Sequence, residues 1–175
     1  DHGKKIYYNK DESIHKEGYY QNGLENGDWK WYHSNSQIYI IESYKNGKKD
    51  GESTHYYENG QISINGFYEE GLRQGRVNKY YENGAIYSKG SYQNGEEEGE
   101  WIYFHNNGEV KYAGIFKQGK QKGDWKWYYK NGKVEIEGIY NDGQKDDKWI
   151  YYDKNSQIKR INTFKNGKLT AAREY

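Results

Sequence analysis

The sequence predicts an all-β protein, an elongated single-layer antiparallel β-meander of about 14 strands built from seven hairpin repeats of 24 residues. Three observations predict this fold. The sequence pattern recurs every 24 residues without an insertion, glycine recurs at turn positions, and the runs between glycines are rich in Tyr, Trp, Ile and Val. Frequent glycine also disfavours helices, because glycine in a helix interior costs backbone entropy.

The repeats fill the chain, which we expect to form a single repeat-array domain, residues 1–175. We number the positions of each repeat from 1 to 24, so that Gly3 occupies position 1. Units of this kind stack on their neighbours and bury a shared core. The predicted repeats are residues 3–26, 27–50, 51–74, 75–98, 99–122, 123–146 and 147–170, and residues 171–175 begin a truncated or capping strand.

Besides position 21, which is always glycine, three positions keep one residue type in all seven repeats. Positions 6 and 18 are aromatic and position 12 is β-branched aliphatic, so we predict that they form the structural core. The internal members of this predicted core are Tyr32, Tyr56, Tyr80, Phe104 and Tyr128 at position 6, Ile38, Ile62, Ile86, Val110 and Val134 at position 12, and Tyr44, Tyr68, Tyr92, Phe116 and Tyr140 at position 18.

Two turn signals divide each repeat into two strands. Asn-Gly occurs at both, as in Asn59-Gly60 and Asn46-Gly47, and it favours a hairpin because both residues tolerate a positive φ. Three-residue loops ending in glycine at both turns would place positions 6, 12, 14, 16 and 18 on one face. We therefore predict these loops, and we expect the glycines at position 16 to let a ring lie against the backbone or the sheet bend.

Composition narrows the function. The chain is 33% hydrophobic and 18% aromatic, and its 27 basic and 26 acidic residues are interspersed, for a net charge of +1. This balance of charge predicts that the protein has no nucleic-acid partner, and it disfavours membrane binding. Cysteine is absent, the five histidines lack the spacing of metal ligands, and no nucleophile or phosphate-loop motif occurs. We therefore expect no catalytic residue, no cofactor, no metal site and no enzyme.

Positions 3 and 5 vary between repeats, and by the register above they lie on the second face. In repeats five to seven they carry a ladder of rings about 9.6 Å apart, which we take as a candidate binding face. The alternative is packing, since this register sets Trp101 opposite Ala113 and Trp149 opposite Ile161. The ladder consists of Trp101, Tyr103, Trp125, Trp127, Trp149 and Tyr151.

The repeat pattern YYENGxI…GxYxxGxxxG, at Tyr56 to Gly75 and again at Tyr80 to Gly99, resembles the variant form of the MORN repeat. The resemblance covers about 168 of the 175 residues. It implies a single-layer β-sheet scaffold for protein contacts, with lipid or membrane binding in some members. Bacterial members of the variant type include antitoxin or immunity proteins that neutralise a partner toxin, and surface proteins that contact host cells. The family shares no catalytic residues, so none is transferred.

We therefore expect a non-catalytic scaffold for protein–protein interaction, either a toxin-neutralising immunity protein or a bacterial surface protein in contact with a host. The alternative is a carbohydrate or envelope-polymer binder that uses the aromatic ladder, and the third is a membrane-lipid binder. The chain begins at Asp1 and lacks methionine, which favours a secreted or cell-surface location over the bacterial cytoplasm. Lysine-rich outer repeats favour a monomer, because charge on edge strands opposes edge-to-edge pairing.

Overall fold

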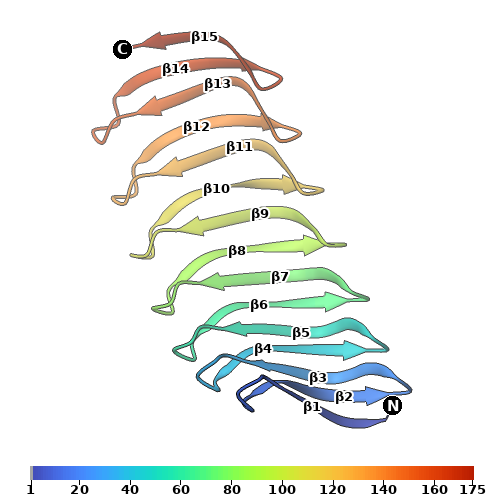
Figure 1. Cartoon of the computed structure of the whole chain (residues 1–175). Helices are drawn as coiled ribbons and strands as arrows, with labels where there is room; N and C mark the ends of the chain where they lie inside the picture. The colour runs from blue at the N-terminus through green and yellow to red at the C-terminus, as the bar shows by residue number, and fades with distance from the viewer. Residues whose placement is uncertain (1) are drawn as a thin grey trace. The chain divides into compact units, whose positions relative to one another are not determined.

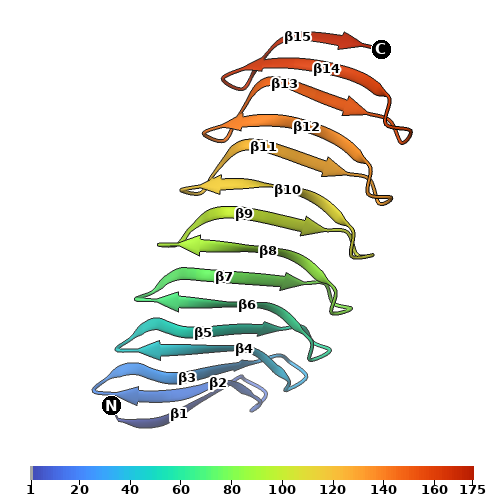
Figure 2. The same ribbon diagram turned by 180° about the vertical axis from the view of Figure 1, so that it is seen from behind.

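The computed structural model describes residues 2–175, which form fifteen β-strands and no helix. The strands make one open antiparallel sheet whose order follows the sequence (Figures 1 and 2). The predicted all-β meander is confirmed. Packing divides the chain into two compact units, residues 1–85 and 86–175.

The first unit contains β1 (Gly3–Tyr8), β2 (Ile14–Gln21), β3 (Leu24–Tyr32), β4 (Ile38–Lys45), β5 (Lys48–Tyr56), β6 (Ile62–Glu69) and β7 (Leu72–Tyr80). The second contains β8 (Ile86–Gln93), β9 (Glu96–Phe104), β10 (Val110–Lys117), β11 (Lys120–Tyr128), β12 (Val134–Asn141), β13 (Gln144–Tyr152), β14 (Ile158–Lys165) and β15 (Lys168–Glu174). Residues 171–174, which the sequence places after the seventh repeat, belong to β15 and pair with β14.

The first turn of each repeat has the predicted three-residue loop. In the second repeat, the His33 N–H donates to the Gln37 carbonyl at 2.8 Å, and the Ser36 N–H donates to the His33 carbonyl at 3.0 Å. The last loop residue has a positive φ, 63° at Ser36 and 81° at Gly60. Glycine is favoured at this position because it has no Cβ to clash with the backbone.

The second turn is shorter than predicted. Lys45 pairs with Lys48, which leaves only Asn46 and Gly47 in the loop, with φ of 50° and 78°. Two consecutive positive φ values are those of a type I′ turn, for which Asn-Gly is the preferred sequence. The prediction of a three-residue loop here is wrong, because Asn-Gly is compatible with either loop length.

A bulge after the first turn changes which side chains share a face. Trp31 pairs with Ile40 and Tyr32 pairs with Ile38, so Tyr39 at position 13 is an extra residue. Positions 6 and 12 therefore project to one face, and positions 14, 16 and 18 project to the other. The Tyr32 hydroxyl accordingly donates to the Glu17 carboxylate, a position-15 side chain, at 2.9 Å.

The predicted composition of the core face is thus wrong. The position-18 rings Tyr44, Tyr68, Tyr92, Phe116 and Tyr140 share their face with positions 3, 5, 14 and 16, which we call the indole face. The members at positions 6 and 12 project to the opposite face, and they are Tyr32, Tyr56, Tyr80, Phe104, Tyr128, Ile38, Ile62, Ile86, Val110 and Val134.

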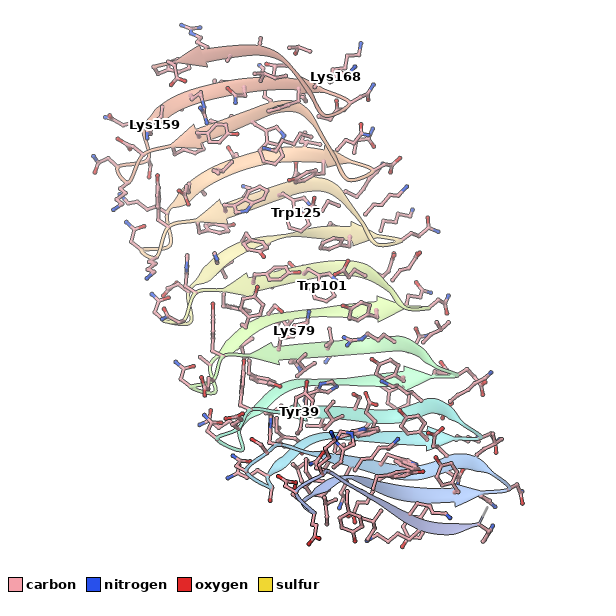
Figure 3. All side chains as sticks on the ribbon, in the orientation of Figure 1. Tyr39, Lys79, Trp101, Trp125, Lys159 and Lys168 are labelled. Carbon is pink, nitrogen blue, oxygen red and sulfur yellow. The ribbon has the colours of Figure 1, made fainter. Side chains whose placement is uncertain are left out.

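The indole face holds the most deeply buried side chains. Trp101 and Trp125 are 0% and 1% exposed, and they lie in the middle of their strands (Figure 3). Each of four indoles lies over the position-16 glycine of the preceding repeat, where a Cβ would overlap the ring. This confirms, for these four glycines, the expectation that they let a ring lie against the backbone; Gly66 faces the Val77 side chain instead. The pairs are Trp29 over Gly18, Trp101 over Gly90, Trp125 over Gly114 and Trp149 over Gly138.

Where position 16 is not glycine, position 3 of the next repeat is not tryptophan. Glu42 replaces the glycine and pairs with Ser53, whose hydroxyl lies 3.4 Å from the carboxylate. Asn162 replaces it in the seventh repeat and pairs with Ala172. Along the array, tryptophan at position 3 therefore occurs only where the preceding repeat has glycine at position 16.

Hydrogen bonds also join successive repeats at their turns. The Asn59 side-chain amide donates to the Glu82 carbonyl at 3.0 Å, and the Tyr57 hydroxyl donates to the Tyr80 carbonyl at 2.6 Å. Similar bonds recur in the second unit from Asn107 to Lys130 and from Tyr129 to Tyr152. These bonds hold the loops of successive repeats in a fixed register, and they do not occupy the two faces of the sheet.

Candidate functional site

A central ladder of side chains crosses the indole face of the second unit. Tyr103 pairs with Tyr112, Tyr112 with Trp127, Trp127 with Ile136, and Ile136 with Tyr151. These five residues come from β9 to β13, and we call them the central ladder. All five are half-buried. Because direct partners in a sheet face the same side, the ladder is a continuous apolar surface one residue wide.

The rings of the central ladder are held in place by one another and by the indoles beside them. The Tyr103 and Tyr112 rings stack with centroids 4.2 Å apart at 22°, and the Tyr112 and Trp127 rings stack at 6.3 Å and 29°. Trp127 also contacts the buried Trp149 at 5.3 Å. Burial, together with the neighbouring Tyr112, raises the pKa of the Tyr103 hydroxyl above its usual value, so it stays neutral.

The structure divides the predicted aromatic ladder into two sets. Tyr103, Trp127 and Tyr151 belong to the central ladder. Trp101, Trp125 and Trp149 are at most 2% exposed and form the core instead. The predicted placement on a face opposite the core is therefore wrong.

The register of that prediction was also shifted by one residue. Trp101 pairs with Gly114 rather than Ala113, and Trp149 pairs with Asn162 rather than Ile161. The position-13 bulge causes both differences, because it moves every later residue of the strand by one place.

Tyr112 and Ile136 are members of the central ladder that the sequence prediction missed. Both occupy position 14, which the bulge sets directly beside position 5. Because side chains at positions 5 and 14 alternate along the ladder, neighbouring members lie about 4.8 Å apart, which is half of the predicted spacing. Aromatic or aliphatic residues at both positions 5 and 14 would have been the signal, had the bulge been recognised.

The ladder ends at a charged residue and a recess. The Arg160 guanidinium lies over the Tyr151 ring at 4.3 Å from its centroid, a cation–π arrangement. A recess of 210 Å³ adjoins this end, with Ile136, Tyr151 and Arg160 in its wall. The same positions in the first unit carry Lys16, His55 and Lys79, so no comparable apolar run occurs there among the described residues.

A buried carboxylate interrupts the indole face of the first unit. The Glu42 side chain is 5% exposed, and its Oε1 lies 2.7 Å from Lys49 Nζ and 3.6 Å from His55 Nε2. Burial raises the pKa of Glu42, but the nearby His55 ring and the hydrogen bond and charge of Lys49 outweigh burial and lower the pKa to about 2. Ser53 and His55 both approach Glu42 rather than each other, so these three residues do not form a nucleophile–base–acid relay.

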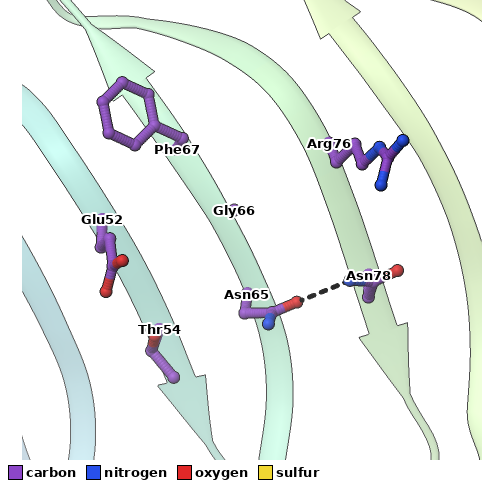
Figure 4. A pocket seen from close by; sticks show the side chains of 7 residues that line it. All are labelled: Glu52, Thr54, Asn65, Gly66, Phe67, Arg76 and Asn78. Atoms are coloured by element: carbon purple, nitrogen blue, oxygen red, sulfur yellow. Dashed lines mark hydrogen bonds between the residues drawn. The ribbon is translucent and has the colours of Figure 1, made fainter.

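Two hollows lie on the opposite face, one in each unit. The first has a volume of 380 Å³ and is shown in Figure 4. The second has a volume of 180 Å³. The first is lined by Glu52, Thr54, Asn65, Phe67, Arg76 and Asn78. No sequence motif indicated either hollow.

Residues 2–175 contain no group of three or more His, Cys, Asp or Glu side chains that could hold a metal ion. In the same residues, no helix has the length and apolarity that crossing a membrane requires.

Comparison with known proteins agrees with the repeat pattern. A family model described as the MORN repeat variant matches residues 25–46, 49–70, 73–94, 97–118 and 121–142. Successive matches begin 24 residues apart and together cover more than half of the chain. No curated protein matches the sequence. The chain belongs to the MORN repeat variant family.

Proposed function

We propose that the protein is a non-catalytic scaffold that binds a partner protein through the central ladder of its second unit. The observation that supports this most strongly is the unbroken run of half-buried Tyr, Trp and Ile side chains from Tyr103 to Tyr151. Tyrosine and tryptophan are enriched at the energetic centres of protein interfaces.

Rigidity supports the same proposal. Ladder rings pack against buried indoles, as Tyr103 does against Trp101 with centroids 6.0 Å apart. Side chains that are already ordered lose little conformational entropy when a partner covers them. The Tyr151 end also offers a recess that an apolar group of the partner could enter, with Ile136 and Tyr151 in its wall.

The geometry favours a protein over a carbohydrate. Sugar rings pack against the flat faces of aromatic side chains. In the ladder, the Tyr103 and Tyr112 rings stack on each other, so these two faces are not open to a sugar ring. The alternating Tyr, Trp and Ile side chains suit the mixed polar and apolar surface of a partner protein.

We propose two biological settings for this interaction, neutralisation of a toxin and contact between a cell surface and a host component. Both follow from the family resemblance and use the same apolar surface. They differ in where the partner is found. A toxin would be captured from the producing cell, and a host component from the target tissue.

The test is affinity capture with a variant that alters the ladder without disturbing the fold. Tyr112→Arg is suitable because position 14 already carries Arg160 in the seventh repeat, where the guanidinium packs on a ring. The matched control is Tyr19→Arg, which makes the same change at a 55% exposed tyrosine on the opposite face. A partner lost with Tyr112→Arg and retained with Tyr19→Arg supports the proposal, and a partner retained by both variants contradicts it.

A further inference from the structure

The two hollows on the opposite face are built from the same repeat positions. Glu52, Phe67 and Arg76 in the first correspond to Asp124, Ile139 and Lys148 in the second. Each residue of the second lies 72 positions after its counterpart in the first, which is three periods of 24. The shared backbone geometry therefore produces a recess, and the residues at positions 2, 4, 15 and 17 determine its chemistry.

At positions 2 and 17, both hollows have the same order of side chains. An acidic side chain lies on the first strand, an apolar side chain on the second and a basic side chain on the third. In the first hollow these are Glu52 on β5, Phe67 on β6 and Arg76 on β7 (Figure 4). The second hollow also contains Lys126 and Glu137, which form an ion pair at 3.3 Å. Phe67 is 43% exposed, so an apolar group of a ligand can cover it.

The first hollow also offers groups that match a peptide bond. The Asn78 Nδ2 donates to the Asn65 Oδ1 at 3.2 Å across β6 and β7. This bond uses one amide donor and one amide acceptor, and it leaves the Asn65 NH₂ group and the Asn78 carbonyl oxygen for other partners. A donor and an acceptor side by side are the complement of a peptide C=O and N–H. The second hollow has Glu137 and Ile150 at these positions, so it lacks this pair.

Spacing indicates the conformation of the segment that fits. The acidic and basic strands are separated by one strand, which sets them about 9.6 Å apart. A polyproline-II helix advances about 9.3 Å in its three-residue turn, so side chains i and i+3 project to one side at this spacing. Side chains i and i+2 of a β-strand are only about 6.6 Å apart. The periodicity of the sheet therefore matches a polyproline-II segment that crosses the strands.

We propose that the hollow formed by Glu52, Asn65, Phe67, Arg76 and Asn78 binds a polyproline-II segment of a partner protein that carries one basic and one acidic side chain three residues apart. The basic side chain lies at Glu52 and the acidic side chain at Arg76. Proline rings cover Phe67, as proline-rich ligands commonly do on aromatic surfaces. This site lies in the first unit, shares no residue with the central ladder and does not depend on it.

The experiment is an NMR titration of the full chain, labelled with ¹⁵N, using capped tetrapeptides. Lys-Pro-Pro-Glu is the probe, and Lys-Pro-Pro-Lys and Glu-Pro-Pro-Glu are its like-charged controls. The comparison is valid for either direction of binding, because a polyproline-II ligand can lie in both. We expect the mixed-charge peptide to bind about tenfold more tightly than either control, since it forms two exposed ion pairs. The shifted amides should include Gly66 and the side chains of Asn65 and Asn78.

Two charge variants make the test specific. Glu52→Lys makes both flanks basic, and it should transfer the preference to Glu-Pro-Pro-Glu. Arg76→Glu makes both flanks acidic, and it should transfer the preference to Lys-Pro-Pro-Lys. Both residues are exposed, so the fold should be retained, as the unshifted spectrum of the second unit would show. Equal binding of all three peptides by the wild type, or no change of preference in the variants, would overturn the proposal. Neither outcome bears on partner binding by the central ladder.

Discussion

The indole of Trp125 lies directly over the backbone of Gly114, in space that any Cβ at that glycine would occupy. The same contact recurs wherever tryptophan occupies position 3. It is the unit of packing in an array that has few aliphatic residues. The tryptophan covers the glycine backbone, and the glycine allows the indole to lie against the sheet, away from solvent.

Gly114→Ala should therefore destabilise the protein by about 3 kcal/mol, because the new methyl group displaces a fully buried indole. The matched control is Gly66→Ala at the same repeat position. There an added Cβ would lie 3.5 Å from the Val77 side chain, an ordinary contact, and φ is not positive. We expect this variant to remain within about 1 kcal/mol of the wild type. Urea denaturation measures both, and equal losses for the two alanines would contradict this account of the packing.

Glu42 should make stability depend on pH in the acidic range. Its pKa falls from 4.5 to about 2 on folding, so it stabilises the folded state above pH 4.5, and this contribution is lost as the pH falls toward 2. Glu42→Gln should cost up to about 3 kcal/mol at pH 7 and much less near pH 2. The control is Glu70→Gln, which removes an exposed ion pair with Lys48 and should change stability by less than about 1 kcal/mol. A Glu42→Gln deficit that is independent of pH would show that the carboxylate is not the stabilising form.

The hydroxyl bond between the loops of successive repeats should contribute measurably to stability. Tyr57→Phe removes only the bond to the Tyr80 carbonyl, at 2.6 Å, and leaves that carbonyl without this donor. We expect a loss of about 1 kcal/mol in the free energy of unfolding. Tyr8→Phe provides the comparison, since Tyr8 is 61% exposed. If thermal unfolding shows the same small change for both variants, the bond contributes nothing.

One substitution should stabilise the fold. Ser36 has φ of 63° at a loop position where four of the other repeats have glycine. A residue with a Cβ incurs a steric penalty in this region, so Ser36→Gly should raise the free energy of unfolding by about 1 kcal/mol. Gln37→Gly, at the next residue, is the control and should lower stability. A melting temperature that falls with Ser36→Gly would show that Ser36 is not strained.

The period of the sequence was sufficient to predict the strands, the first turn and the family. It was not sufficient to assign side chains to the two faces of the sheet. That assignment requires the exact number of residues between successive cross-strand pairs, which a bulge changes by one. The position-13 bulge has no residue preference, since Tyr39, Lys111 and Glu135 all occur there. One unrecognised bulge moved Trp101 and Trp125 from the core to a supposed binding face. Tyr112 and Ile136 were missed for the same reason.

The hollows of the opposite face were beyond sequence prediction for a different reason. Their lining comes from three strands, so it combines side chains at positions 2 and 4 of two successive repeats with side chains at positions 15 and 17 of the strand between them. Once the register is known, positions 2, 4, 15 and 17 can be read directly from any repeat of the array.

We propose a protein as the partner of the half-buried ladder from Tyr103 to Tyr151. The most direct test is the dissociation constant of the captured partner for the wild type, Tyr112→Arg and Tyr19→Arg, measured on proteins with equal melting temperatures. Tyr112→Arg should weaken binding at least about tenfold, because the arginine replaces an aromatic ring at the centre of the interface. Tyr19→Arg should leave the constant unchanged. Equal constants for all three proteins would contradict the claim and place the interface elsewhere on the molecule.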